Sequence, residues 1–322
     1  MAADRVNSFT PFPGFSEGVE ECWTELEGAR MRYLRAGPAK SPSFDKLRTG
    51  FLAKNARNGA PGPALILLHG LLGYSFSWRF AMPALAPYAT VYAPDMMGAG
   101  FSDRADVDYS MRGTARRLLR FIRGLGVSSF DLLGTSHGGA VAMMAAEECL
   151  SGNFGLHLER LILVAPVNPY SAHGRRLAPF FGSNFGSALF RRFIPRMNLF
   201  YPYWHARMYG DRERIPAGTL EGYKAPLAKP GLFDHALSIV RTWTADLREL
   251  ETVLPKLANV PTLLMWGSKD TAVYASSAER LAKFFPNSES IVFPGIGHLP
   301  YEECPEEFNR AVIGFLTRGE TG

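Results

Sequence analysis

Long apolar runs are missing from this sequence. Within its 322 residues, no stretch approaches the ~18 consecutive apolar residues that a membrane-spanning helix needs. Residues 1–18 contain Asp4, Arg5 and two prolines, with no apolar segment of the kind found in a secretory signal. We therefore expect an unexported, cytoplasmic protein without stable membrane insertion.

Cysteine is also scarce. The chain has three cysteines, Cys22, Cys149 and Cys304, at unrelated spacings. An odd number without a regular spacing argues against both a disulfide framework and a zinc site, and it is typical of reduced thiols. We expect no metal and no organic cofactor.

Clusters of positive charge are few. The formal net charge is +5, but Lys and Arg are scattered, apart from short pairs at residues 116–117, 175–176 and 191–192. Scattered cations argue against nucleic-acid binding, which needs a basic face or stripe. There is no internal repeat, and the 47% hydrophobic content is ample for a packed core.

Short apolar runs alternate with helical patterns through most of the chain. Continuous apolar runs are typical of strands buried on both faces, and their alternation with helices predicts an α/β fold with a mostly parallel sheet covered on both sides. The strand-like runs are residues 64–68, 91–93, 130–133, 161–164, 262–265 and 291–293, and the helical patterns are residues 77–86, 111–123, 140–150, 275–285 and 305–316.

The pattern divides the chain into an extension, a core and an inserted cap. Residues 1–18 form the predicted extension; residues 19–166 and 255–322 form the core, which begins with a hairpin at 22–26 and 30–35. Residues 39–63 are polar and rich in Gly and Pro, so we expect an exposed insertion. Residues 167–254 lack a clear buried strand but carry many aromatic residues, which indicates a helical cap.

The stretch Gly134–Gly138 has the pattern G-x-S-x-G between an apolar strand and a helix of small residues. In a nucleophile elbow the turn is so tight that the central residue is strained, and flanking glycines are required because a Cβ would collide with the neighbouring strand or helix. Ser136 is therefore the candidate nucleophile. An ordinary glycine-rich turn is the alternative.

A serine nucleophile needs a base and a group that orients the base. His298 follows the last strand in a glycine-rich loop, and Asp270 follows the strand before it. His298 can take the serine proton, and the Asp270 carboxylate can accept a hydrogen bond from the imidazole and stabilise the imidazolium. The order Ser136, Asp270, His298 along the chain favours this reading over a turn-forming aspartate.

The oxyanion that forms after attack needs hydrogen-bond donors. His69-Gly70-Leu71-Leu72-Gly73 follows the first long apolar strand. We assign one backbone N–H donor to Leu71, with Leu72 as the alternative, and the second to His137, the residue after the nucleophile. His69 is interpreted as a structural residue that braces the loop.

Taken together, these motifs resemble the α/β-hydrolase fold over about residues 20–318. The resemblance rests on His69-Gly70, the loop 95–102, the Ser136 elbow, the stretch 266–270 and Gly297-His298. It implies that loop 95–102 is structural. Haloalkane dehalogenases and epoxide hydrolases of this fold have Asp at the nucleophile position, so Ser136 argues against both.

The resemblance implies a capped serine hydrolase that cleaves a carboxylic ester of modest size through an acyl-enzyme. Leu71-Leu72 is more similar to the carboxylesterase branch than to the glycine-rich oxyanion loop of carbon–carbon hydrolases. The aromatic cap favours an apolar or aryl substrate. Carbon–carbon bond hydrolysis of ring-cleavage products, amide or peptide hydrolysis, and a ligand sensor on a hydrolase fold stay open, as does the oligomeric state.

Overall fold

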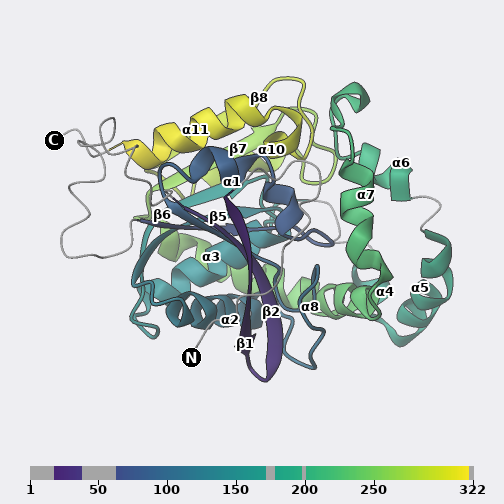
Figure 1. Ribbon diagram of the computed structural model, residues 1–322. Helices are drawn as coiled ribbons and strands as arrows, with labels where there is room; N and C mark the ends of the chain where they lie inside the picture. The colour runs from purple at the N-terminus through teal and green to yellow at the C-terminus, as the bar shows by residue number, and fades with distance from the viewer. Residues whose placement is uncertain (1–17, 38–62, 172–177, 198–200, 319–322) are drawn as a thin grey trace.

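A computed structural model describes residues 18–37, 63–171, 178–197 and 201–318 (Figure 1). The predicted exposed insertion at 39–63 lies outside the described residues except for Pro63, and the predicted extension at 1–18 lies outside them except for Gly18. The division into extension, core and cap stays a prediction.

An eight-stranded sheet forms the centre of the fold, in the order β1-β2-β4-β3-β5-β6-β7-β8. β2 is antiparallel to β1 and β4, and all other neighbouring pairs are parallel. The predicted α/β fold with a mostly parallel sheet is confirmed. The strands are β1 Val19–Leu26, β2 Ala29–Ala36, β3 Ala64–Leu68, β4 Thr90–Pro94, β5 Ser129–Thr135, β6 His157–Val164, β7 Thr262–Gly267 and β8 Ser288–Phe293.

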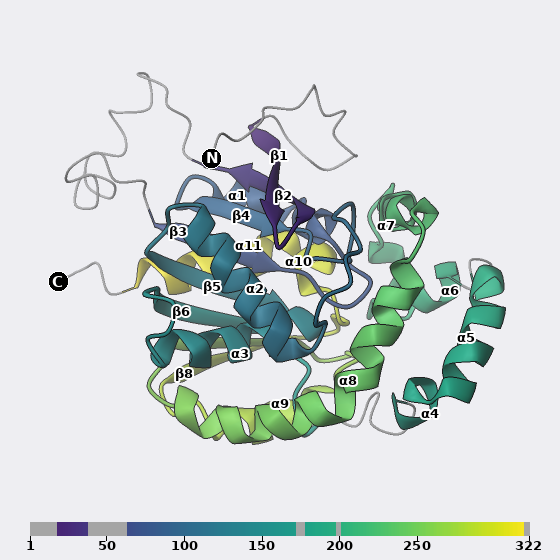
Figure 2. The same cartoon turned by 90° about the horizontal axis from the view of Figure 1, so that it is seen from below.

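Helices cover both faces of the sheet (Figure 2). Side chains alternate across a strand, so that Leu65 and Leu67 of β3 enter one apolar layer and Ile66 and Leu68 the other. The first layer includes α1 (Ala81–Leu85) and α11 (Pro305–Thr317). The second includes α2 (Met111–Gly124), α3 (His137–Leu150) and α9 (Ala278–Ala282).

Two expected helices are shorter or divided in the structure. Residues 77–86 form the end of the 3-10 helix η1 (Ser75–Trp78) and then α1, and between the two helices Arg79 directs its guanidinium to the buried carboxylate of Glu302. Residues 275–285 form η5 (Ala275–Ser277) and α9 and then end in turns, since Pro286 disfavours helical geometry before it.

Between β6 and β7, the residues that the structure describes form helices joined by turns and loops, without a strand. Figure 1 shows α4, α5, α6 and α7 beside the sheet rather than over it. α8 packs against the end of α4 at Val240 and Arg241, and it also contacts α3 and α2. The bounds are α4 Ala178–Gly182, α5 Asn184–Met197, α6 Tyr201–Ala206, η2 Arg212–Arg214, α7 Thr219–Lys224, η3 Ala225–Ala228, α8 Leu232–Val253 and η4 Leu254–Leu257. Among the described helices, none combines the length and apolar character needed to cross a membrane.

Candidate active site

Ser136 lies in the sharp turn between β5 and α3. Its backbone has φ of 52° and ψ of −122°, a left-handed conformation that costs energy for a residue with a side chain. A Cβ on Gly134 would come within 2.4 Å of the carbonyl oxygen of Gly138, and a Cβ on Gly138 within 2.3 Å of that of His69. The elbow geometry expected from the sequence is therefore present.

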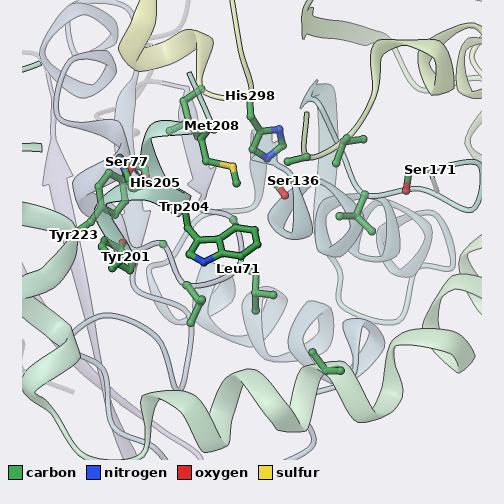
Figure 3. A pocket seen from close by; sticks show the side chains of 18 of the residues that line it. Leu71, Ser77, Ser136, Ser171, Tyr201, Trp204, His205, Met208, Tyr223 and His298 are labelled. Atoms are coloured by element: carbon green, nitrogen blue, oxygen red, sulfur yellow. Dashed lines mark hydrogen bonds between the residues drawn. The ribbon is translucent and has the colours of Figure 1, made fainter. Parts of the chain in front are cut away.

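His298 and Asp270 are hydrogen-bonded partners above this turn. The imidazole Nδ1 lies 2.7 Å from Asp270 Oδ2, and both side chains are buried. The second carboxylate oxygen, Oδ1, accepts the N–H groups of Ala272 and Val273 at 2.7 and 2.9 Å. Figure 3 shows the imidazole of His298 next to the hydroxyl of Ser136. The fold thus brings together the three predicted catalytic side chains, although their catalytic roles stay predictions.

Glu303 connects the loop of His298 to the segment that follows α6. Its Oε2 accepts the N–H groups of Gly297 at 2.7 Å and Gly210 at 3.0 Å, and its Oε1 accepts the N–H of Asp211 at 3.1 Å. The buried carboxylate therefore fixes the residue before His298. Sequence reasoning missed this residue; the only signal was an acidic pair in an otherwise apolar stretch.

Glu302, the other member of that pair in α10 (Pro300–Glu303), is also buried. Its carboxylate pairs with Arg79 at 2.8 Å and accepts the hydroxyl of Tyr209 at 2.6 Å and that of Tyr223. Arg79 also donates to the hydroxyl of Thr219 at 2.8 Å. This buried pair links α10 and η1 to the helical segment that contains α7.

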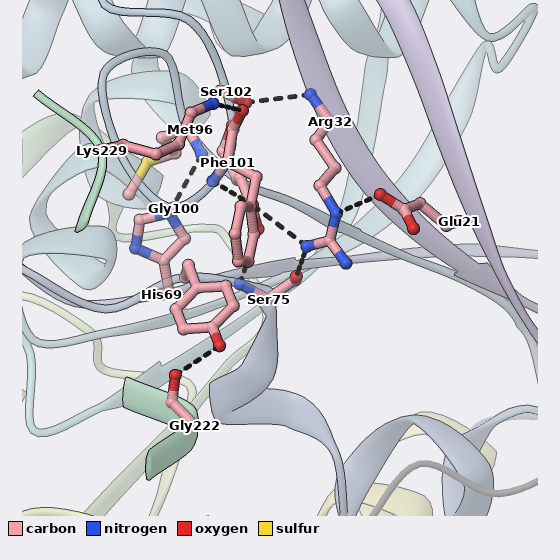
Figure 4. Close-up of polar contacts among 12 residues, drawn as sticks. Glu21, Arg32, His69, Ser75, Met96, Gly100, Phe101, Ser102, Gly222 and Lys229 are labelled. Atoms are coloured by element: carbon pink, nitrogen blue, oxygen red, sulfur yellow. Dashed lines mark hydrogen bonds and ion pairs between the residues drawn. The ribbon is translucent and has the colours of Figure 1, made fainter. Parts of the chain in front are cut away.

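The loop after β3 approaches Ser136 from the neighbouring strand. A Cβ on Gly70 would lie 3.1 Å from that of Ser136. His69 Nδ1 donates to the carbonyl of Gly70 at 2.8 Å, and Nε2 accepts the N–H of Met96 at 3.0 Å (Figure 4). Burial lowers the pKa of His69, so the imidazole is neutral and braces the loop, as the sequence indicated.

The loop 95–102 is held by a buried ion pair. Asp95 accepts the N–H groups of Ser75 and Phe101, both at 2.9 Å, and pairs with Arg32 at 3.1 Å (Figure 4). Ser102 donates its hydroxyl to the carbonyl of Asp95 at 2.6 Å. These contacts agree with the structural role that the sequence resemblance implied for this loop.

His137 is the first residue of α3, so its N–H has no partner within the helix and lies at the positive end of the helix dipole. The ring stacks on Trp243, with centroids 6.0 Å apart. Burial lowers the pKa of His137 to about 4, which keeps the imidazole neutral. The positive end of the α3 dipole therefore stabilises a negative charge beside Ser136. The assignment of His137 and Leu71 as oxyanion donors stays a prediction.

Ser136 and His298 line a cavity of about 410 Å³. Apolar side chains from the loops of the sheet and from α4, α6 and α8 line most of it: Leu71, Leu72, Val167, Ala178, Phe181, Trp204, Met208, Val240, Trp243, Val273 and Leu299. Polar side chains gather at one end, where Figure 3 shows Ser77, Tyr201, His205 and Tyr223 together. Within the described ranges, no group of three or more His, Cys, Asp or Glu is arranged to hold a metal ion.

Sequence comparison identifies relatives over most of the chain. The uncharacterized protein Rv2715 of Mycobacterium tuberculosis is 27% identical over 307 residues, which cover 90% of this chain and 86% of that protein. Haloalkane dehalogenase 2 of Mycobacterium tuberculosis is 27% identical over 259 residues, or 78% of this chain and 87% of its own length.

Structure comparison identifies the same fold in several solved proteins. Cfl2 from Burkholderia cenocepacia superposes with a TM-score of 0.75 at 19% identity and covers 93% of this chain and 96% of its own. A variant of the meta-cleavage product hydrolase CumD from Pseudomonas fluorescens IP01 has a TM-score of 0.66 at 22% identity and covers 91% of this chain and 96% of its own. The profile of the α/β hydrolase fold matches residues 63–305. The chain therefore belongs to the α/β hydrolase fold family and is a hydrolase of this fold.

Proposed function

We propose that this protein is a serine hydrolase that cleaves a carboxylic ester with an apolar acyl or aryl group. The observation that carries the proposal is the placement of the strained Ser136 beside the His298–Asp270 pair at the wall of an apolar cavity. A nucleophile, a base and an orienting carboxylate in this chain order form the constellation used for acyl transfer.

In the proposed reaction, Ser136 Oγ attacks the ester carbonyl while His298 Nε2 accepts its proton. The Nδ1–H of His298 is held by Asp270 Oδ2 at 2.7 Å, which fixes the tautomer that leaves Nε2 free to act as a base. The N–H groups of Leu71 and His137 hold the oxyanion. His298 then protonates the departing alcohol, and a water activated by the same imidazole releases the acid.

The substrate class follows from the cavity lining. Most lining side chains are aliphatic or aromatic, so an apolar acyl or aryl group would bury its surface there at roughly 25 cal/mol per Å². Burial lowers the pKa of His205, so the polar end of the cavity presents a neutral imidazole and hydroxyl groups rather than a charge. We therefore propose a neutral ester.

A fluorophosphonate probe followed by intact-mass measurement tests the nucleophile. The parent protein should gain one adduct, and Ser136→Ala should gain none. No adduct on a folded parent protein would contradict an assembled triad and would favour a ligand sensor on a hydrolase fold. A panel of aryl, medium-chain and short polar esters then tests the apolar cavity, because equal turnover of all three would contradict it.

Carbon–carbon bond hydrolysis is the second candidate reaction, supported by the fold shared with CumD. The same triad can serve this reaction, and the polar end of the cavity could receive a carboxylate or enol oxygen of a ring-fission product. Parallel assays on an aryl ester and a ring-fission diketone separate the two, since the preferred substrate should have the higher kcat/KM. An amide of the same acyl group, included in the panel, tests amide hydrolysis. A cytoplasmic location stays a prediction.

A further inference from the structure

Exposed apolar side chains occur on α4, α5 and α6. These helices lie at the end of the molecule away from the sheet (Figures 1 and 2). We call Phe180, Phe185, Leu189, Tyr203 and Trp204 the cap patch. Phe185 is 72% exposed and Trp204 is 52% exposed. Large apolar side chains gathered on a surface mark an interaction site more often than scattered ones do.

The helix α5 exposes one of its apolar faces. Phe185, Ala188, Leu189 and Arg192 recur at the spacing of one helical face, and all four are exposed, whereas Gly186 and Ser187 are buried. A surface helix of a globular protein normally turns its apolar stripe inward. Here an apolar stripe that ends in a cation faces outward.

Positive charge predominates around the patch. The sequence has no Asp or Glu between Glu159 and Asp211, although Asp234 of α8 pairs with Arg191 of α5 at 2.7 Å. Arg192 is exposed on the outer face of α5, and the Arg207 guanidinium lies 6.0 Å from the ring centroids of both Tyr203 and Trp204. If the patch bound the same patch of a second copy of the chain, the arginines of one copy would face the equivalent arginines of the other. An anionic surface would complement them.

The patch is continuous with the wall of the catalytic cavity. The ring of Phe180 packs edge-on against the rings of Phe185 and Phe181, with centroid distances of 6.3 and 5.3 Å. Phe181 and Trp204 both line the cavity that contains Ser136. Apolar side chains therefore lead from the protein surface to the catalytic residues.

We propose that the cap patch binds peripherally to the surface of an anionic lipid bilayer, so that an apolar ester passes from the lipid into the cavity. Aromatic and aliphatic side chains enter the boundary between headgroups and acyl chains, and cations attract anionic headgroups. Lipid binding does not depend on the proposed reaction. Only the delivery of substrate rests on the proposed function.

Co-sedimentation with vesicles tests the binding. The full chain should bind vesicles of equimolar phosphatidylcholine and phosphatidylglycerol more than vesicles of phosphatidylcholine, and added salt should weaken the binding. Combining Phe185→Ser, Leu189→Ser and Arg192→Glu should lower vesicle affinity about tenfold or more. These residues do not line the cavity, so turnover of a water-soluble ester should be unchanged.

Two controls separate binding from folding and from catalysis. Leu150→Ser changes a similarly exposed side chain at the end of α3 and should leave vesicle affinity unchanged. Ser136→Ala should bind vesicles as the parent does, so that failure of the proposed reaction and failure of lipid binding give different results. The emission of Trp204 should shift to shorter wavelength on vesicles, and Trp204→Phe should remove that shift.

Two results would overturn the proposal. One is equal or absent binding to both vesicle types by the parent protein. The other is a dimer in light scattering that the combined substitutions at 185, 189 and 192 dissociate without any change in vesicle affinity, which would assign the cap patch to a second copy of the chain.

Discussion

Replacing Glu303 by glutamine tests whether the contact between the loop of His298 and the segment after α6 supports catalysis. The carboxylate accepts three backbone N–H groups with two oxygens. A carboxamide keeps one oxygen. In the best arrangement this oxygen serves Gly297 and Gly210, and the amide nitrogen then faces the N–H of Asp211.

The cost follows from the bonds that are lost or weakened. Leaving one donor unsatisfied costs about 1 to 3 kcal/mol, and the two retained bonds lose the extra strength of an ionised acceptor. Burying a neutral amide instead of a charge offsets part of this loss. We expect Glu303→Gln to reduce the free energy of unfolding by roughly 2 to 3 kcal/mol, with a melting temperature several degrees lower.

The kinetic effect should be larger than the stability effect suggests. Gly297 precedes His298, so a loosened loop moves the base relative to Ser136, and a displacement of about 1 Å can cost roughly 100-fold in rate. We expect kcat for an aryl ester and the rate of fluorophosphonate labelling to fall about 10- to 100-fold. KM should change little, because the cavity lining is intact.

Glu306→Gln is the matched control, since Glu306 is an exposed acidic residue in the first turn of α11. It should leave kcat and the melting temperature unchanged. The reasoning would be refuted if Glu303→Gln lowered the melting temperature but reacted with the probe at the parent's rate, because Glu303 would then stabilise the fold without positioning His298.

Three further predictions concern the site and its surroundings. Asp270→Asn should lower kcat by about 10³- to 10⁴-fold, because the imidazole loses the carboxylate that fixes its tautomer; steady-state kinetics with the folded variant checks this, and near-parent turnover would contradict the role of Asp270. Gly138→Ala should abolish probe labelling, since its Cβ would meet the carbonyl of His69 at 2.3 Å, whereas Gly124→Ala, with nothing within 4 Å, should label normally. Burial raises the pKa of Asp246 to about 6, so the folded state binds this proton more tightly than the unfolded chain and the group lowers stability as the pH rises through about 6. Asp246→Asn should therefore raise the melting temperature at about pH 8 more than at about pH 5, and an equal shift at both pH values would contradict the raised pKa.

The strands of the parallel sheet and the elbow were predictable because their signals are local. A continuous apolar run such as 64–68 can be satisfied only by burial on both faces. The glycines around Ser136 mark a turn that excludes any Cβ, and the chain order of Ser136, Asp270 and His298 places each residue after a strand. Parallel strands then bring their carboxyl ends to one edge of the sheet.

The helix limits were less predictable than the strands. The pattern at 77–86 has the spacing of one helix, but the structure divides it at Arg79 and Phe80, and the guanidinium of Arg79 reaches Glu302, 223 residues further along the chain. The end of the helix at 275–285 had a local signal in Pro286, which the periodicity alone did not include.

The sequence by itself determined the fold class, the nucleophile turn and the candidate base and carboxylate, because these depend on burial and on steric limits within a few residues. Only the tertiary structure decided which acidic side chains fix the loops around the catalytic residues. Glu302 and Glu303 are neighbours of one residue type, yet one is bound by Arg79, whereas the other accepts three backbone N–H groups and lies 3.9 Å from Arg214. The same holds for the cap patch, since a sequence lists its aromatic residues but does not show which of them face the cavity and which face solvent. Those choices follow from packing between segments far apart in the chain, where the direction of a side chain is set by the surfaces that meet around it.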